Sequence, residues 1–105
     1  MTTVHIEQRH IDEGKQCNIQ GCPAALAIRE KTGKPAWVQA HHIEFHNKKR
    51  GVVEVAYLSK EIKQWIRAFD WMGKNSAKPT SFKLVIDREY KYEGNPIHFA
   101  EKCLT

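Results

Sequence analysis

The chain has 105 residues, 41% of them hydrophobic, and its net charge at pH 7 is +5. This length corresponds to one domain, with enough apolar residues for a single core without disulfides or metals. The N-terminus lacks the layout of a signal peptide, and the longest unbroken apolar run, residues 23–28, is far shorter than a membrane helix. We therefore expect a cytoplasmic protein without membrane association, whose three cysteines stay reduced.

The first third of the chain predicts a strand, a connection and a helix. Val4 and Ile6 alternate with polar residues, as in a short strand. Residues 9–21 contain two glycines and mixed polar residues, which indicate a connection with one helical turn over residues 10–13. A helix begins at Pro23 and continues through several alanines, and Gly33 ends it.

The remainder predicts a hairpin, a second helix and a last strand. Residues 36–47 form one strand and residues 52–58 another, joined by the polar turn 47–51. Ser59 is a suitable N-cap for a helix in which apolar residues recur at i, i+3, i+4 and i+7, and Gly73 ends this helix. Residues 81–87 alternate again and predict the closing strand.

The order β-α-β-β-α-β predicts an α+β fold, a two-layer ferredoxin-like sandwich of four antiparallel strands backed by two helices. We assign residues 1–87 to this single domain and residues 88–105 to an irregular C-terminal extension. With right-handed crossovers, one end of the sandwich gathers the loops 17–22, 47–51 and 73–79.

Positive charges concentrate in two of these three loops. The start of the first long helix would add unpaired backbone N–H groups, which attract phosphate. This basic pole predicts contact with nucleic acid or with a nucleic-acid-handling complex. The simpler interpretation is that the lysines are merely solvated and that Trp71 closes the edge of the core. The predicted binding residues are Lys48, Lys49, Arg50, Arg67, Trp71, Lys74 and Lys78.

The cysteines offer a second type of site. Cys17 and Cys22 could bind zinc together with His46, and Cys103 or His10 could complete the four ligands that a structural zinc needs. Alternatively, Cys22 could be a reactive thiol at a helix N-terminus, with His46 as its base. The simpler interpretation is that Cys22 packs in the core as a small apolar residue. Apart from zinc, we expect no cofactor.

Residues 50–57, RGVVEVAY, resemble the third strand of an RNA-recognition motif, a family that also has the order βαββαβ. Arg50, Gly51, Val55 and Tyr57 match the motif. Val52 and Glu54, however, replace the two aromatic residues that face outward and stack on bases in that family. We therefore expect any nucleic-acid contact to use loops rather than the sheet.

Three further segments resemble uncharacterised small proteins of phages and bacteria. They are H-I-x-x-G at residues 10–14, C-P-x-A-x-A at residues 22–27 and W-I-x-x-F-D at residues 65–70, followed by an F-x-L-x-I strand at residues 82–86. The resemblance extends from about residue 4 to residue 87. It implies a mobile-element context and assigns neither an activity nor a site residue.

Together these observations predict a small non-enzymatic, phage-encoded binding module that docks through its basic pole, with inhibition of host defence as one role. P-loop, G-x-S-x-G, G-x-G-x-x-G and H-E-x-x-H motifs are absent from the sequence. Two alternatives stay open. One is the zinc or thiol site at Cys17 and Cys22, and the other is a homodimer that pairs the edge strand carrying Trp37 and Phe45.

Overall fold

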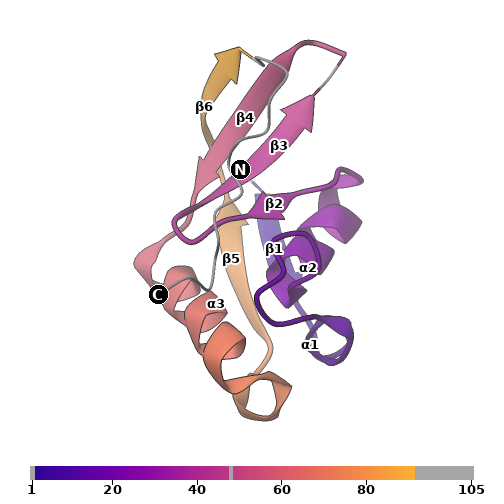
Figure 1. Ribbon diagram of the computed structural model, residues 1–105, viewed down its shortest axis with the longest axis vertical. Helices are drawn as coiled ribbons and strands as arrows, with labels where there is room; N and C mark the ends of the chain where they lie inside the picture. The colour runs from indigo at the N-terminus through magenta and orange to yellow at the C-terminus, as the bar shows by residue number, and fades with distance from the viewer. Residues whose placement is uncertain (1, 48, 92–105) are drawn as a thin grey trace.

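The computed structural model describes residues 2–47 and 49–91, which form two antiparallel sheets and three α-helices (Figure 1). In chain order the elements are β1 (Thr2–Ile6), α1 (Gln8–Glu13), α2 (Pro23–Thr32), β2 (Trp37–Val38), β3 (His42–Asn47), β4 (Val52–Tyr57), α3 (Lys60–Met72), the 3-10 turn η1 (Lys74–Ser76), β5 (Thr80–Leu84) and β6 (Ile86–Lys91).

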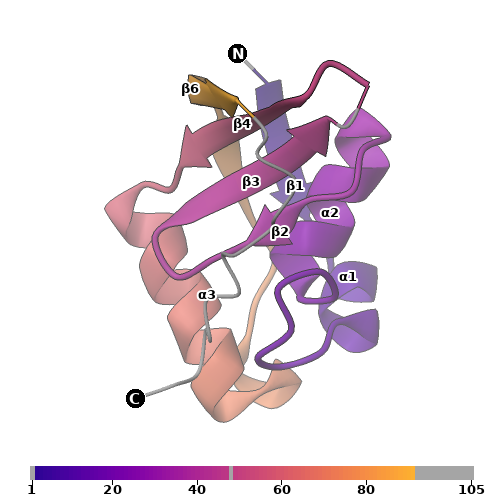
Figure 2. The same ribbon diagram turned by 45° about the horizontal axis from the view of Figure 1, so that its top comes forward.

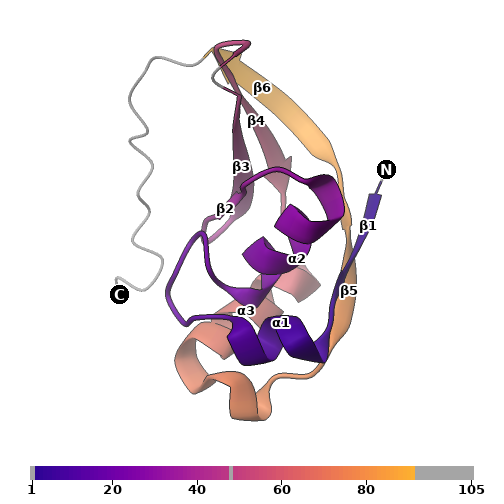
Figure 3. The ribbon, with the colours of Figure 1, turned by 90° about the vertical axis from the view of Figure 1, so that its right-hand side faces the viewer.

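The α+β class is confirmed, but the strands do not form the single four-stranded sheet of a ferredoxin-like sandwich. β1 pairs with β5 in a two-stranded sheet, whereas β2, β3, β4 and β6 form a four-stranded sheet in that order. β5 and β6 are separated by Val85 alone and run on as one long, bent element. Figure 3 shows the helices inside this bend, between the two sheets.

Both predicted long helices are present, and their ends follow the expected chemistry. Pro23 occupies the first turn of α2, and Gly33 ends it in the left-handed conformation at φ 73°. Ser59 caps α3, where its hydroxyl oxygen accepts a hydrogen bond from the Ile62 N–H. Ile62, Ile66 and Phe69 are buried, which confirms the predicted apolar stripe.

Two strands differ from the prediction. The strand expected at residues 36–47 is a short hairpin, because the chain reverses at residues 39–41, where the Gln39 N–H donates to the His42 carbonyl. The closing strand breaks at Val85, and its second part pairs with β4 as far as Lys91. Residues 88–91, the start of the expected C-terminal extension, therefore belong to this sheet. The rest of the expected extension, residues 92–105, lies outside the described residues.

One core joins all three helices to the sheets. Side chains of α2 and α3 pack against the inward faces of β1, β5 and the middle of the four-stranded sheet. On β3 and β4 the inward side chains are Ile43, Phe45 and Ala56, all less than 5% exposed. The alternate side chains on these strands therefore point to the opposite face, which the described helices do not cover (Figure 2).

A charged cluster attaches α1 to α2. The Arg9 guanidinium donates two hydrogen bonds to the Glu30 carboxylate. The buried His10 accepts the Glu7 N–H at its Nδ1, so its ring proton is on Nε2 and points at Glu30, 3.3 Å away. The hydrogen bonds from Arg9, followed by that from His10, lower the pKa of Glu30 from 4.5 to about 2.

This cluster predicts a pH-dependent contribution to stability. Because the pKa of Glu30 is lower in the folded chain than in the unfolded chain, the contribution is complete above pH 4.5 and disappears as the pH falls toward 2. We expect Glu30→Gln to be less stable than wild type at pH 7 and to approach it near pH 2, measured by urea unfolding. A difference that stays constant over this range would contradict the assignment.

Candidate functional site

The predicted basic pole does not gather at one end of the molecule. Asn47 pairs with Val52 beside the β3–β4 turn, whereas His42 pairs with Tyr57 at the other end of the same ladder. α3 starts three residues after Tyr57 and continues away from the turn instead of folding back toward it (Figures 1 and 3). Lys49 and Arg50 therefore lie at one end of the molecule, and Lys74 and Lys78 lie toward the other. Lys48 is outside the described residues.

The other two predicted loops do meet. Asp70, near the end of α3, accepts a hydrogen bond from the Cys17 N–H at 3.0 Å, and its carbonyl accepts one from the Gln16 side chain at 3.0 Å. These bonds hold the loop between α1 and α2 against the end of α3. The β3–β4 turn therefore lies apart from the other predicted binding residues, which are on α3, on η1 or just after η1.

The outward side of α3 combines positive charge with an exposed aromatic side chain. Lys60, Arg67 and Trp71 recur at i, i+7 and i+11, and this spacing places them along one side of the helix. Trp71 is 69% exposed, so it does not close the edge of the core. We use the name α3–η1 surface for the exposed or half-exposed set Lys60, Lys63, Arg67, Trp71, Lys74 and Lys78.

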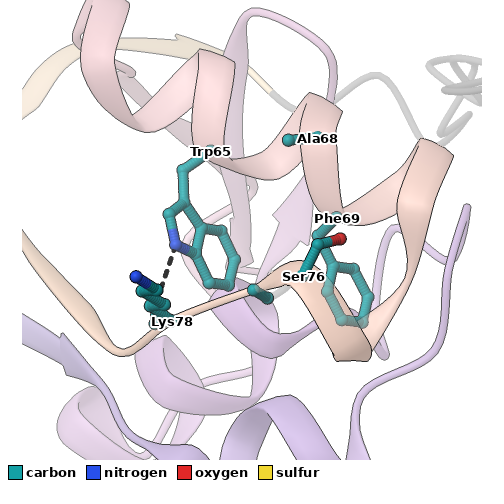
Figure 4. A pocket seen from close by; sticks show the side chains of 6 residues that line it. Trp65, Ala68, Phe69, Ser76 and Lys78 are labelled. Carbon is teal, nitrogen blue, oxygen red and sulfur yellow. Dashed lines mark hydrogen bonds between the residues drawn. The ribbon is translucent and has the colours of Figure 1, made fainter.

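A shallow pocket of about 250 Å³ lies between α3 and the segment that follows η1 (Figure 4). The Trp65 indole forms one wall and donates a hydrogen bond to the Lys78 carbonyl at 2.9 Å. Phe69 stacks on Trp65 with a ring centroid distance of 6.0 Å. The hydrogen bond from Trp65 holds the Lys78 backbone beside α3. The backbone of the last lysine of the α3–η1 surface therefore has a defined position.

The residues predicted to bind zinc are not assembled into a metal site in the part of the chain that the structure describes. Cys22 is 1% exposed and packs in the core as a small apolar residue, the simpler of the interpretations considered. Cys17 is exposed, lies against Asp70 and forms a disulfide, so the expectation that all three cysteines stay reduced is wrong. His46 is bonded to Glu44 at 2.9 Å. Cys103 lies outside the described residues.

The segments that suggested a phage or bacterial resemblance act structurally. A Cβ on Gly14 would lie 2.5 Å from the Pro23 ring, so H-I-x-x-G and C-P-x-A-x-A are packed directly against each other. Ile11 and Ile66 are core residues, and Asp70 ties the third segment to the loop between the first two. The three segments therefore meet because they build the junction of α1, α2 and α3.

Sequence reasoning missed a polar and aromatic face on the four-stranded sheet. His42, Glu44 and His46 are two residues apart on β3, so their side chains share one face. Glu44 is bonded to His42 at 2.7 Å and to His46 at 2.9 Å. The signal was the pattern H-x-E-x-H within a predicted strand.

The edge expected for a homodimer is not available in the predicted form. Phe45 is 4% exposed and belongs to the core. Trp37 is half-buried and packs on His46, with 4.4 Å between ring centroids. β2 itself is two residues long, which leaves little backbone for pairing with another chain.

None of the helices formed by residues 2–47 and 49–91 has the length and hydropathy required to cross a membrane. Comparison of the chain with protein-family models, with curated proteins and with solved structures finds no match.

Proposed function

We propose that the protein is a non-enzymatic binding module that holds the phosphate backbone of nucleic acid on its α3–η1 surface. The observation that carries the proposal is the row Lys60, Arg67 and Trp71, in which a tryptophan that is 69% exposed lies at the end of a positively charged helix side. Cationic side chains beside an exposed aromatic ring are the combination that nucleic-acid-binding surfaces use.

Local electrostatics support a polyanionic ligand. The acidic residues of α3 are Glu61 and Asp70, and neither lies on this row. Asp70 is half-buried and accepts the Cys17 N–H, so its carboxylate is already used within the fold. The row therefore presents positive charge without a carboxylate in it, in a chain whose net charge is +5.

The proposal predicts strongly salt-dependent binding of a short oligodeoxythymidylate. Each phosphate contact in a single strand contributes about −0.7 to the slope of log K against log salt, so five cations predict a slope of about −3 to −4. Fluorescence anisotropy of a labelled oligonucleotide over a salt series measures this slope. Binding that does not change with salt, or no binding at low salt, would contradict the proposal. A phage origin and a role against host defence stay predictions of the sequence resemblance.

A further inference from the structure

The face of the four-stranded sheet that the described helices do not cover carries a connected row of aromatic and cationic side chains. From β2 to β6 the row contains Trp37, His46, His42, Tyr57, Arg88 and Tyr90. The ladder pairings place these residues on one face: Trp37 is opposite Glu44, Tyr57 is opposite His42, and Arg88 is opposite Val55. The row therefore extends across all four strands of the sheet.

The β4 and β6 end of the row is partly open to solvent. Tyr57 is 45% exposed and Tyr90 is 49% exposed, although Val53 and Val55 on the same face are 9% and 4% exposed. The Arg88 guanidinium lies over both rings, 4.9 Å from the centroid of Tyr57 and 5.9 Å from that of Tyr90. Arg88 also donates a hydrogen bond to the Tyr90 hydroxyl at 2.7 Å, so the three side chains support each other's orientation.

The strand register removes the expected obstacle to a nucleic-acid site on the sheet, the outward charge of Glu54. Glu54 pairs with the buried Phe45 and so belongs to the inward face, whereas the outward residues of β4 are Val53, Val55 and Tyr57. The carboxylate expected to repel RNA is therefore not on the face that carries Tyr57. The acid that does lie there, Glu44, is 3% exposed and bonded to two imidazoles.

Cations border the same face at the β3–β4 turn. Lys49 and Arg50 lie in the turn. Lys91 pairs with Val52 and therefore points with it to the inward side of the sheet. The acids nearby are each close to an arginine: Glu89 lies 3.6 Å from Arg50, and Asp87 lies 3.5 Å from Arg88. Among the described cations of this turn, Lys49 is left to attract phosphate, near the end of β4 at which Val53 pairs with Tyr90.

We propose that this face is a second nucleic-acid site, at which Tyr57, Arg88 and Tyr90 stack the bases of a single strand while Lys49 contacts its phosphates. Aromatic rings and guanidinium planes accept any base because every base has a π-face, and a paired duplex would not offer its bases to them. The inference adds a surface to the proposed function and does not depend on the α3–η1 surface.

The test compares two pairs of substitutions in the full chain. Tyr57→Leu with Tyr90→Leu removes both rings, whereas Tyr57→Phe with Tyr90→Phe keeps them and removes the hydroxyl groups. We expect each lost ring to weaken binding of a short oligodeoxythymidylate by about 5- to 150-fold and the phenylalanine pair to bind close to wild type. Equal affinities for the two pairs would overturn the inference. Because both tyrosines are about half exposed, neither pair removes core packing.

A second measurement uses the Trp71→Leu variant, so that the exposed ring of the α3–η1 surface cannot contribute base stacking. Inorganic polyphosphate carries the charge of a nucleic acid without bases. We expect this variant to bind the oligodeoxythymidylate more tightly than polyphosphate of equal charge at the same salt concentration. Equal binding of the two ligands would overturn base stacking and leave the α3–η1 proposal in place. Binding of neither ligand would overturn both.

Discussion

Replacement of Gly14 by alanine is expected to destabilise the fold by about 3 kcal/mol, the upper part of the range for an overpacked site. An alanine Cβ would lie 2.5 and 2.6 Å from two atoms of the Pro23 ring and 2.8 Å from the His10 carbonyl oxygen. A proline ring and a helix carbonyl have no other rotamer to adopt, so the junction of α1 and α2 must shift. The loss of unfolding free energy can be measured by urea denaturation.

Gly21→Ala is the matched control. The added Cβ would meet only the Asn18 side chain, at 3.1 Å or more, and that side chain can yield by a small movement. We expect its cost to be well below that of Gly14→Ala. Similar losses for the two variants would show that the contact between H-I-x-x-G and C-P-x-A-x-A does not determine the spacing of the helices.

Local elements of this fold could be predicted because their signals are local. The cap at Ser59, the proline at the start of α2 and the left-handed Gly33 are each decided by the chemistry of a few neighbouring residues. The apolar spacing of α3 likewise identified its buried face correctly. None of these signals depends on where another segment of the chain lies.

Which loops lie at the same end of the molecule could not be predicted in this way. The reversal at residues 39–41 leaves β2 only two residues long, and the sequence there contains neither glycine nor proline to mark a turn. The direction of α3 depends on how β5 leaves it to pair with β1, a contact between residues nearly 80 positions apart. The prediction of a basic pole was wrong because it required both the strand lengths and the direction of α3 to be right.

The second surface was missed for a different reason. Tyr57 was recognised as part of the match to an RNA-binding strand, but the match placed Val52 and Glu54 outward. A shift by one residue exchanges the two faces of a strand, and the pairing of Phe45 with Glu54 decides which face is inward. Tyr90 lay in a segment expected to be irregular, so its place beside Tyr57 had no signal in the sequence.

The central claim, that the α3–η1 surface holds nucleic acid, is tested most directly by neutralising it. The triple variant R67Q/K74Q/K78Q removes three cations, and no described salt bridge involves any of them. The control K31Q/K34Q/K83Q removes the same charge from exposed positions in and after α2 and on β5. Both variants therefore have the same net charge and keep the core intact.

Anisotropy titration of an oligodeoxythymidylate at 50 mM salt compares the two variants with wild type. Three lost phosphate contacts predict a fall in affinity on the order of 10²-fold for R67Q/K74Q/K78Q and a salt slope that is shallower by about 2. The control is expected to show a much smaller loss from reduced overall charge. Equal losses for the two variants would contradict the claim, because binding would then follow net charge and not this surface.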